Sequence, residues 1–184
     1  MTEPANFSGD RCVCENPGPP AAFRPAGPET GCPGRCGVVE SHKVSGEPVF
    51  PNFRPIRLED RDVIRNAFWA YQPETSELTF TTCFIWRTHY RFSWCWLGDT
   101  IVFLCKPPRG VLHAMEPVGP PPRTDAVRTV LRWLREEKGI SSPAVERADA
   151  RLVEEVAGCS DLVCEPVREH FDYLYRTEDL VSLP

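Results

Sequence analysis

The sequence predicts an α+β fold, a layer sandwich in which helices cover a mostly antiparallel sheet. Of its 184 residues, 41% are hydrophobic and five are Trp, which is ample for one globular core. Two apolar runs joined by a two-residue Gly-Asp turn predict a β-hairpin near the middle of the chain. Apolar residues spaced three and four apart over residues 124–138 predict an amphipathic helix after it. We expect the element order β-α-α-β-β-β-α-β-α-β-β.

Regular structure is expected to begin near Phe53, because the preceding segment is rich in helix and strand breakers. Residues 1–52 hold nine Pro and seven Gly and show no hydrophobic periodicity. We therefore expect residues 1–52 to form an irregular or disordered extension, followed by one domain over residues 53–184. A short strand at residues 53–58 opens this domain, and Pro55 places it at a sheet edge. Apolar positions over residues 59–71 then predict an amphipathic helix.

The segment of residues 76–90 is unusually aromatic. Its aromatic side chains fall at two i,i+4 spacings, which predicts a helix with two apolar stripes and a largely buried surface: Phe80, Phe84, Trp86 and Tyr90. The same segment carries Glu77, Arg87 and His89, and charged groups in an apolar site need partners. It is therefore either a core helix with satisfied polar groups or one wall of a binding pocket.

The remaining elements follow from alternation, turns and caps. Residues 91–97 and 100–106 form the hairpin across Gly98-Asp99, and residues 111–115 add a third strand. Thr124 or Asp125 can cap the helix of residues 124–138, and Gly139 closes it. The last predicted elements are a strand, a helix and two strands, at residues 142–145, 148–156, 162–167 and 171–175.

Composition excludes several classes of function. The net charge is −5 and the pI about 5.4, so we expect no autonomous binding to nucleic acid or to an anionic membrane. No apolar run reaches the length of a membrane span, and the first residues do not resemble a signal peptide. A cytoplasmic location is therefore the expectation. Nine Cys, an odd number, argue against a fully paired disulfide framework.

Four of the cysteines form two short-spaced pairs before residue 40: Cys12, Cys14, Cys32 and Cys36. Zinc is commonly held by two such pairs, so these thiols are candidate ligands of a zinc site. Neither pair has the common C-x2-C spacing, and incidental thiols in a disordered tail are the competing interpretation. The other five cysteines lie in predicted apolar elements, where core packing is the ordinary role.

Three segments together resemble one bacterial family. They are Phe53-Arg-Pro-Ile-Arg-Leu-Glu-Asp60, then Ser76-Glu-Leu-Thr-Phe80 followed by Trp86-Arg87 and Tyr90, and last Phe171-Asp-Tyr-Leu-Tyr-Arg-Thr-Glu-Asp-Leu180. In this order they resemble the phosphatidylglycerol lysyltransferase C-terminal domain family, over residues 53–184. The resemblance implies a GNAT-like α+β fold, since the family is built from two tandem GNAT-like acyltransferase folds. Its characterised members move an aminoacyl group from aminoacyl-tRNA to the hydroxyl of a membrane phospholipid.

The resemblance covers the first half of the tandem pair. The family continues with a basic segment into its second fold, whereas this sequence stops at Pro184. We therefore expect an N-terminal half of an aminoacyl- or acyltransferase, a fragment that is inactive without the second GNAT-like half as its partner. Aminoacyl-tRNA or another acyl donor would bind the complete protein. No catalytic residue can be assigned. A pocket shared with the second half would be lined by residues of the aromatic segment: Ser76, Glu77, Thr79, Trp86 and Arg87.

One loop bears on how an acyl donor could bind, and two other functions stay open. GNAT enzymes that use acyl-CoA hold its pyrophosphate on backbone N–H groups of a glycine-rich turn. The matching loop here, residues 116–123, contains three consecutive prolines that lack N–H donors, so we expect no pyrophosphate binding there. A non-catalytic binding or structural module is the alternative, and a zinc-dependent interaction protein is a third hypothesis. Apart from zinc, no cofactor is implied.

Overall fold

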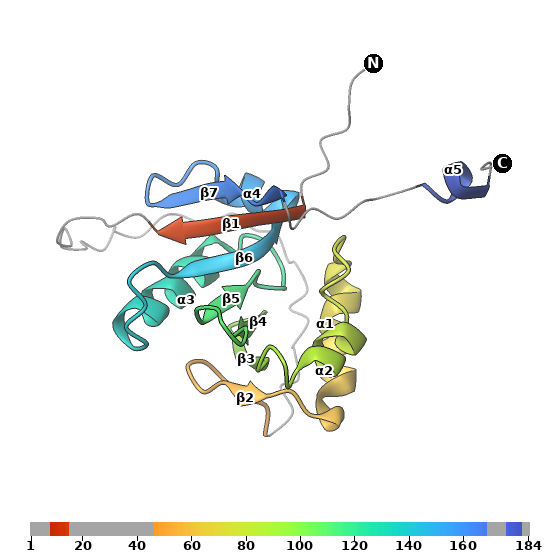
Figure 1. Ribbon diagram of the computed structural model, residues 1–184, viewed down its shortest axis with the longest axis horizontal. Helices are drawn as coiled ribbons and strands as arrows, with labels where there is room; N and C mark the ends of the chain where they lie inside the picture. Colours follow the sequence, from red (N-terminus) through yellow and green to blue (C-terminus); the bar gives the residue numbers. More distant parts are fainter. Residues whose placement is uncertain (1–7, 15–45, 169–175, 182–184) are drawn as a thin grey trace, which may run out of the picture.

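A computed structural model describes residues 8–14, 46–168 and 176–181 of the chain (Figure 1). The strands are β1 Ser8–Cys14, β2 Arg54–Pro55, β3 Ser93–Leu97, β4 Thr100–Cys105, β5 His113–Met115, β6 Ala144–Asp149 and β7 Leu162–Pro166. The helices are the 3-10 turn η1 Leu58–Asp60, α1 Arg61–Tyr71, α2 Phe80–Trp86, α3 Thr124–Glu136, α4 Ala150–Val156 and α5 Thr177–Val181.

The described strands form one seven-stranded sheet in the order β2-β3-β4-β5-β6-β1-β7. Every neighbouring pair is antiparallel except β5 and β6, which are parallel. A parallel pair needs a crossover connection, and α3 supplies it. The mostly antiparallel sheet with helices on its faces confirms the predicted α+β class, and β3 and β4 confirm the predicted hairpin.

Alternation along β4 divides the core between the two faces of the sheet. Val102 and Leu104 belong to a cluster with side chains of α3 and α4, whereas Ile101 and Phe103 belong to a cluster with side chains of α1 and α2. All six residues of β4 are buried, as expected for a strand covered on both faces. Figure 1 shows α1 and α2 together on one side of the sheet.

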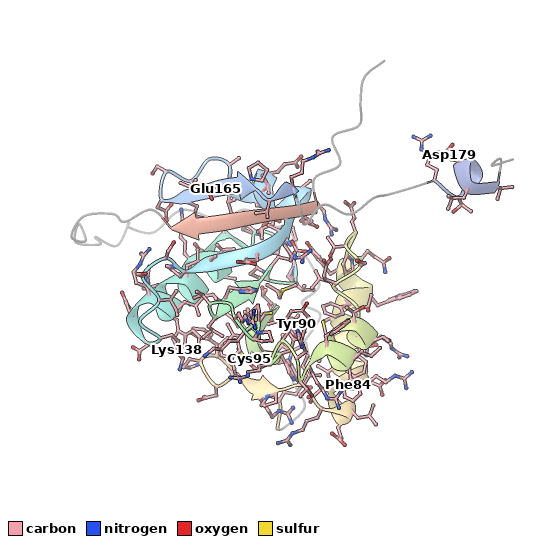
Figure 2. The ribbon with its side chains drawn as sticks, viewed as in Figure 1. Phe84, Tyr90, Cys95, Lys138, Glu165 and Asp179 are labelled. Atoms are coloured by element: carbon pink, nitrogen blue, oxygen red, sulfur yellow. The ribbon has the colours of Figure 1, made fainter. Side chains whose placement is uncertain are left out.

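The expectation of a buried helix over residues 76–90 is wrong. The helix α2 has only seven residues and begins after Thr79, whose hydroxyl accepts a hydrogen bond from the Thr82 N–H. Of its side chains only Cys83 is buried, while Ile85 is 64% exposed and Trp86 48% exposed. Phe80 and Phe84 stack on each other at a centroid distance of 5.4 Å and are only half-buried at the edge of the core cluster. Figure 2 shows the side chain of Phe84 on α2.

Two parts of the expected irregular extension are ordered instead. Ser8–Cys14 forms β1, which pairs with β6 on one side and with β7 on the other. Residues 48–50 lie against β3, where the Trp96 N–H donates to the Pro48 carbonyl and the Phe50 N–H donates to the Trp96 carbonyl. The rest of that extension lies outside the described residues, as does the strand expected at residues 171–175.

The ends of α3 differ in how well the sequence predicted them. Neither expected N-cap is correct, because Arg123 occupies that position and makes no side-chain cap, and the Thr124 hydroxyl donates to the Glu155 carbonyl instead. The predicted closing glycine is confirmed. Gly139 lies two residues after the C-cap residue Glu137 and has φ +67°, and the Ile140 N–H that follows it donates to the Leu134 carbonyl at 3.0 Å.

Candidate binding site beside α2

A cavity of about 470 Å3 lies between the start of α2 and the sheet, and we call it the α2 cavity. It is open to solvent on one side, and its size falls within the range of small-molecule sites. Aromatic, acidic and basic side chains share its lining: Ser76, Glu77, Thr82, Trp86, Tyr90, Phe92, Cys105, Pro107, His113, Met115, Glu146 and Arg147. Tyr90, labelled in Figure 2, is part of this wall.

Three of the five residues predicted from the sequence to bind substrate line this cavity, and two do not. Ser76, Glu77 and Trp86 are in the lining. Thr79 is outside it and caps α2. Arg87 is also outside, where its guanidinium lies 3.8 Å from the centre of the Phe84 ring and donates to the Phe84 carbonyl.

Glu77 meets a partner that the sequence did not indicate. Its carboxylate Oε1 accepts a hydrogen bond of 2.5 Å from Nη1 of Arg147, on β6. The two side chains are 24% and 28% exposed, so water reaches the pair and screens it. This ion pair therefore joins the loop before α2 to the sheet without being buried in the core.

A β-bulge places Arg147 in the cavity. Between Val145 and Ala148 β6 advances three residues while β1 advances two, so one extra residue of β6 is accommodated. Arg147 has φ +63°, a left-handed conformation that is uncommon for a side chain other than Gly or Asn. In a regular strand Glu146 and Arg147 would point to opposite faces, but here both line the same cavity. Bulges and strained residues of this kind are concentrated at functional sites.

The α2 cavity also contains a histidine and a cysteine. Nε2 of His113 lies 3.6 Å from Oε2 of Glu146, and Nδ1 lies 3.0 Å from the Val111 carbonyl. Cys105 pairs with His113 in the β4–β5 ladder, but burial raises the pKa of its thiol to about 12. A thiol that stays protonated is a poor nucleophile, so this arrangement is not that of a Cys-His enzyme.

A second and larger cavity, of about 800 Å3, lies where the loop after β5 meets α1 and α4, and we call it the proline-loop cavity. Its walls combine small and apolar residues with paired charges: Ala67, Ala70, Tyr71, Trp96, Asp99, Val118, Gly119, Pro120, Pro121, Arg123, Arg151, Glu154 and Glu155. The loop expected not to bind pyrophosphate forms part of it.

The arginines of the proline-loop cavity are already committed to protein carboxylates. Arg123, whose side chain is 1% exposed, donates from Nε and Nη2 to Glu155, and from Nη1 to the Tyr71 hydroxyl and the Pro117 carbonyl. The Arg123 backbone N–H also donates to Glu155, at 2.6 Å. Arg151 donates to Asp149 at 2.6 Å. This network ties the loop to α4 and α1, and we assign it a structural role.

The pKa values of two carboxyl groups at the base of this network are shifted in opposite directions. Burial raises the pKa of Glu116 to about 8, and the charge of Asp149 adds to the effect. Burial alone would also raise the pKa of Asp149, but hydrogen bonds from the Leu152 N–H, Arg151 and the Tyr71 hydroxyl outweigh it and lower that pKa. Glu116 is fully buried, and its Oε2 accepts the Asp149 N–H at 2.9 Å.

Only two of the four candidate zinc ligands lie in the described part of the chain. Cys12 and Cys14 are in β1, opposite Val145 and Leu162, while Cys32 and Cys36 lie outside the described residues. Among the described residues, no group of three or more His, Cys, Asp or Glu side chains is placed to hold a metal ion. In the same part of the chain no helix combines the length and the apolar character needed to cross a lipid bilayer.

The comparison with protein families decides the relationship. The family described as phosphatidylglycerol lysyltransferase, C-terminal, matches residues 69–184, which is more than half of the chain. The chain belongs to this family. The match contains both the aromatic segment and β6, so both sides of the Glu77–Arg147 pair lie within it.

Other comparisons add little. No curated protein matches the chain. A crystal structure of a conserved protein of unknown function from Bacteroides thetaiotaomicron VPI-5482 is similar, with 27% identity and a TM-score of 0.43. The alignment covers 47% of this chain and 29% of that one, so the chain spans less than a third of the length of that protein.

Sequence reasoning missed the sheet side of the α2 cavity in this family member. Glu146 and Arg147 were expected to follow a strand ending at residue 145, but β6 continues to Asp149. The pairing of Arg147 with a residue 70 positions away has no local signature. Only the charged residues inside the aromatic segment, which needed partners, pointed toward such a contact.

Proposed function

We propose that this chain is the N-terminal, donor-binding half of an aminoacyl- or acyltransferase and that the α2 cavity receives the aminoacyl group. Membership in the phosphatidylglycerol lysyltransferase C-terminal family supports the reaction class. In this proposal the ester carbonyl of the donor is attacked only when a second GNAT-like fold completes the site.

One observation carries the assignment of the cavity, and it is the position of the Glu77 carboxylate beside aromatic rings. An aminoacyl ester has a free ammonium but no free carboxylate. The carboxylate of Glu77 can bind an ammonium by a charge-assisted hydrogen bond, and the rings of Trp86 and Tyr90 in the same wall can add cation–π attraction. The pair with Arg147 is partly exposed, so Glu77 is accessible to a ligand.

The test uses amino-acid amides, which mimic the ester but do not hydrolyse readily. We expect L-lysinamide or L-leucinamide to bind the purified chain, measured by isothermal titration calorimetry. N-acetylation of the amide removes the ammonium, and Glu77→Gln removes the carboxylate charge. Each should weaken binding by about tenfold or more, the typical worth of a hydrogen bond to a charged group. Glu59→Gln, at an exposed residue of η1, is the matched control. Amide binding that is unaffected by Glu77→Gln would overturn the assignment.

The exposed apolar residues of α1 and α2 support a second fold as partner. Trp69 on α1 is 77% exposed, and Ile85 and Trp86 on α2 are 64% and 48% exposed. Exposed large apolar side chains on two packed helices fit a surface that a partner covers. We expect aminoacyl transfer by this chain only when a second GNAT-like half of the family is supplied, and transfer by the chain alone would contradict the proposal.

A non-catalytic binding module is favoured by a different observation. The thiol of Cys105 stays protonated, and His113 is 8% exposed with both ring nitrogens near oxygen atoms. The Cys105 thiol is therefore a poor nucleophile, and both His113 ring nitrogens already have oxygen neighbours. Retained amide binding without transfer, even with the second half present, would select this alternative.

A further inference from the structure

The Glu77–Arg147 pair uses only part of the bonding capacity of each group. Oε1 of Glu77 and Nη1 of Arg147 make the contact. A guanidinium has five N–H donors and a carboxylate has a second oxygen. Within the described residues, Nη2 and Nε of Arg147 and Oε2 of Glu77 have no hydrogen-bond partner. The pair therefore offers one cationic and one anionic position side by side, at the edge of an aromatic cavity.

We propose that the α2 cavity binds a free α-amino acid as a zwitterion, with its ammonium on the Glu77 carboxylate and its carboxylate on the Arg147 guanidinium. The ligand would then close a ring of alternating charges without breaking the existing ion pair. The inference rests on the proposed function in placing the ammonium at Glu77. It goes further in assigning the carboxylate to Arg147 and in naming a free amino acid as the ligand.

The backbone at Arg147 supports a ligand-binding role. A left-handed conformation at a residue with a long side chain is costly, and glycine or asparagine would adopt it with less strain. A partly exposed ion pair gives little stability in return. The bulge nevertheless turns a planar, bidentate donor into the cavity, which is the geometry that suits a carboxylate.

The rest of the lining fits an amino-acid side chain. The ring centroid of Tyr90 lies 5.8 Å from that of Trp86 and 5.9 Å from that of Phe92, so the three aromatic side chains form a continuous wall. Met115, from β5, adds a polarisable apolar surface. This wall favours an amino acid whose side chain is apolar or has a long aliphatic stem.

The experiment compares acid and amide forms of the same ligand by calorimetry. The chain is titrated with L-phenylalanine, L-leucine and L-lysine, and the tightest binder is then tested as its amide and as its N-acetyl derivative. We expect the free acid to bind about tenfold or more tightly than the amide. Arg147→Gln should abolish this preference, so that the acid and the amide bind this variant with similar affinity. Arg91→Gln is the matched control, because Arg91 also has a positive φ, of +50°, and lies outside the cavity lining.

The possible failures separate the two proposals. If the amide binds through Glu77 but the free acid has no Arg147-dependent advantage, the zwitterion proposal is wrong and the donor assignment stands. If the acid binds through both Arg147 and Glu77 while the amide does not bind at all, the donor assignment is wrong and the zwitterion proposal stands. The chain is also titrated with inorganic phosphate. If phosphate binds as strongly as the amino acid and this binding depends on Arg147, then Arg147 binds phosphate rather than a carboxylate. Binding of none of the amino acids overturns the proposal. Arg147→Gly serves as the second variant if Arg147→Gln folds poorly.

Discussion

Replacing Arg147 by glycine should remove the preference for the free acid over the amide while leaving the fold almost as stable as before. The residue has φ +63°, and a left-handed conformation costs a residue with a Cβ about 1–2 kcal/mol. Glycine removes that cost but adds about 0.5–1 kcal/mol of chain entropy on folding. The ion pair with Glu77 contributes at most about 1 kcal/mol, because both side chains are partly exposed. These contributions nearly cancel, so we expect a change within about 1 kcal/mol of the wild type.

Alanine at the same position separates strain from charge. Arg147→Ala also loses the ion pair but keeps the Cβ, and therefore the strain of the left-handed backbone. It should be less stable than Arg147→Gly by about 1 kcal/mol, which corresponds to roughly 2–4 °C in Tm for a domain of this size. Urea and thermal unfolding followed by circular dichroism measure both variants, with Arg91→Gly and Arg91→Ala as the matched pair at φ +50°. If Arg147→Ala were as stable as Arg147→Gly, the bulge and the reasoning built on it would be refuted.

Three further predictions concern the polar groups. Glu77→Gln should lower the free energy of unfolding by less than about 1 kcal/mol, because its pair is partly exposed; a loss of several kcal/mol in urea unfolding would instead show a tightly buried pair. Arg123→Ala should cost about 3–5 kcal/mol in the same assay, because it removes a guanidinium that is 1% exposed and leaves Glu155 without the cation it pairs with. A loss below about 1 kcal/mol would contradict the structural role of the network. The pKa of Glu116 is about 8 in the folded protein, against an ordinary value of 4.5. Between these two pH values the folded state holds a proton that the unfolded state has lost. The free energy of unfolding therefore falls as pH rises through this window, by up to about 1.4 kcal/mol per pH unit. Glu116→Gln should flatten the fall in Tm between pH 6 and pH 8. An unchanged slope would show that another group causes the pH dependence.

Local patterns predicted most of the sheet and helices of this fold. The Gly98-Asp99 turn located β3 and β4, and the spacing of apolar residues located α1 and α3, because turns and amphipathic faces are encoded over a few residues. β1 was missed for the opposite reason. Its sequence is flanked by Pro and Gly, and it becomes a strand by pairing with β6 and β7, which lie far away in the chain.

Only part of the candidate site could be predicted from the sequence, because the rest depends on contacts between residues far apart in the chain. Ser76, Glu77 and Trp86 stand out in a short aromatic segment, and they do line the α2 cavity. Arg147 enters it through a bulge that depends on the register between β6 and β1, and no local sequence pattern encodes that register. The exposure of Trp86 was also not predictable from spacing, since an i,i+4 aromatic stripe is equally compatible with a core helix and with a cavity wall.

The indole signals of tryptophan give the most direct test of the central claim, that the α2 cavity is the ligand site. Trp86 lines this cavity and Trp96 lines the proline-loop cavity, so each indole N–H reports on one of them. In a two-dimensional proton–nitrogen spectrum of chain labelled at tryptophan, L-leucinamide and free L-leucine should both shift the Trp86 signal and leave that of Trp96 in place. The Glu77→Gln variant should require a markedly higher concentration of either ligand for the same shift. A shift of Trp96 with Trp86 unmoved would place the ligand in the other cavity and contradict the account.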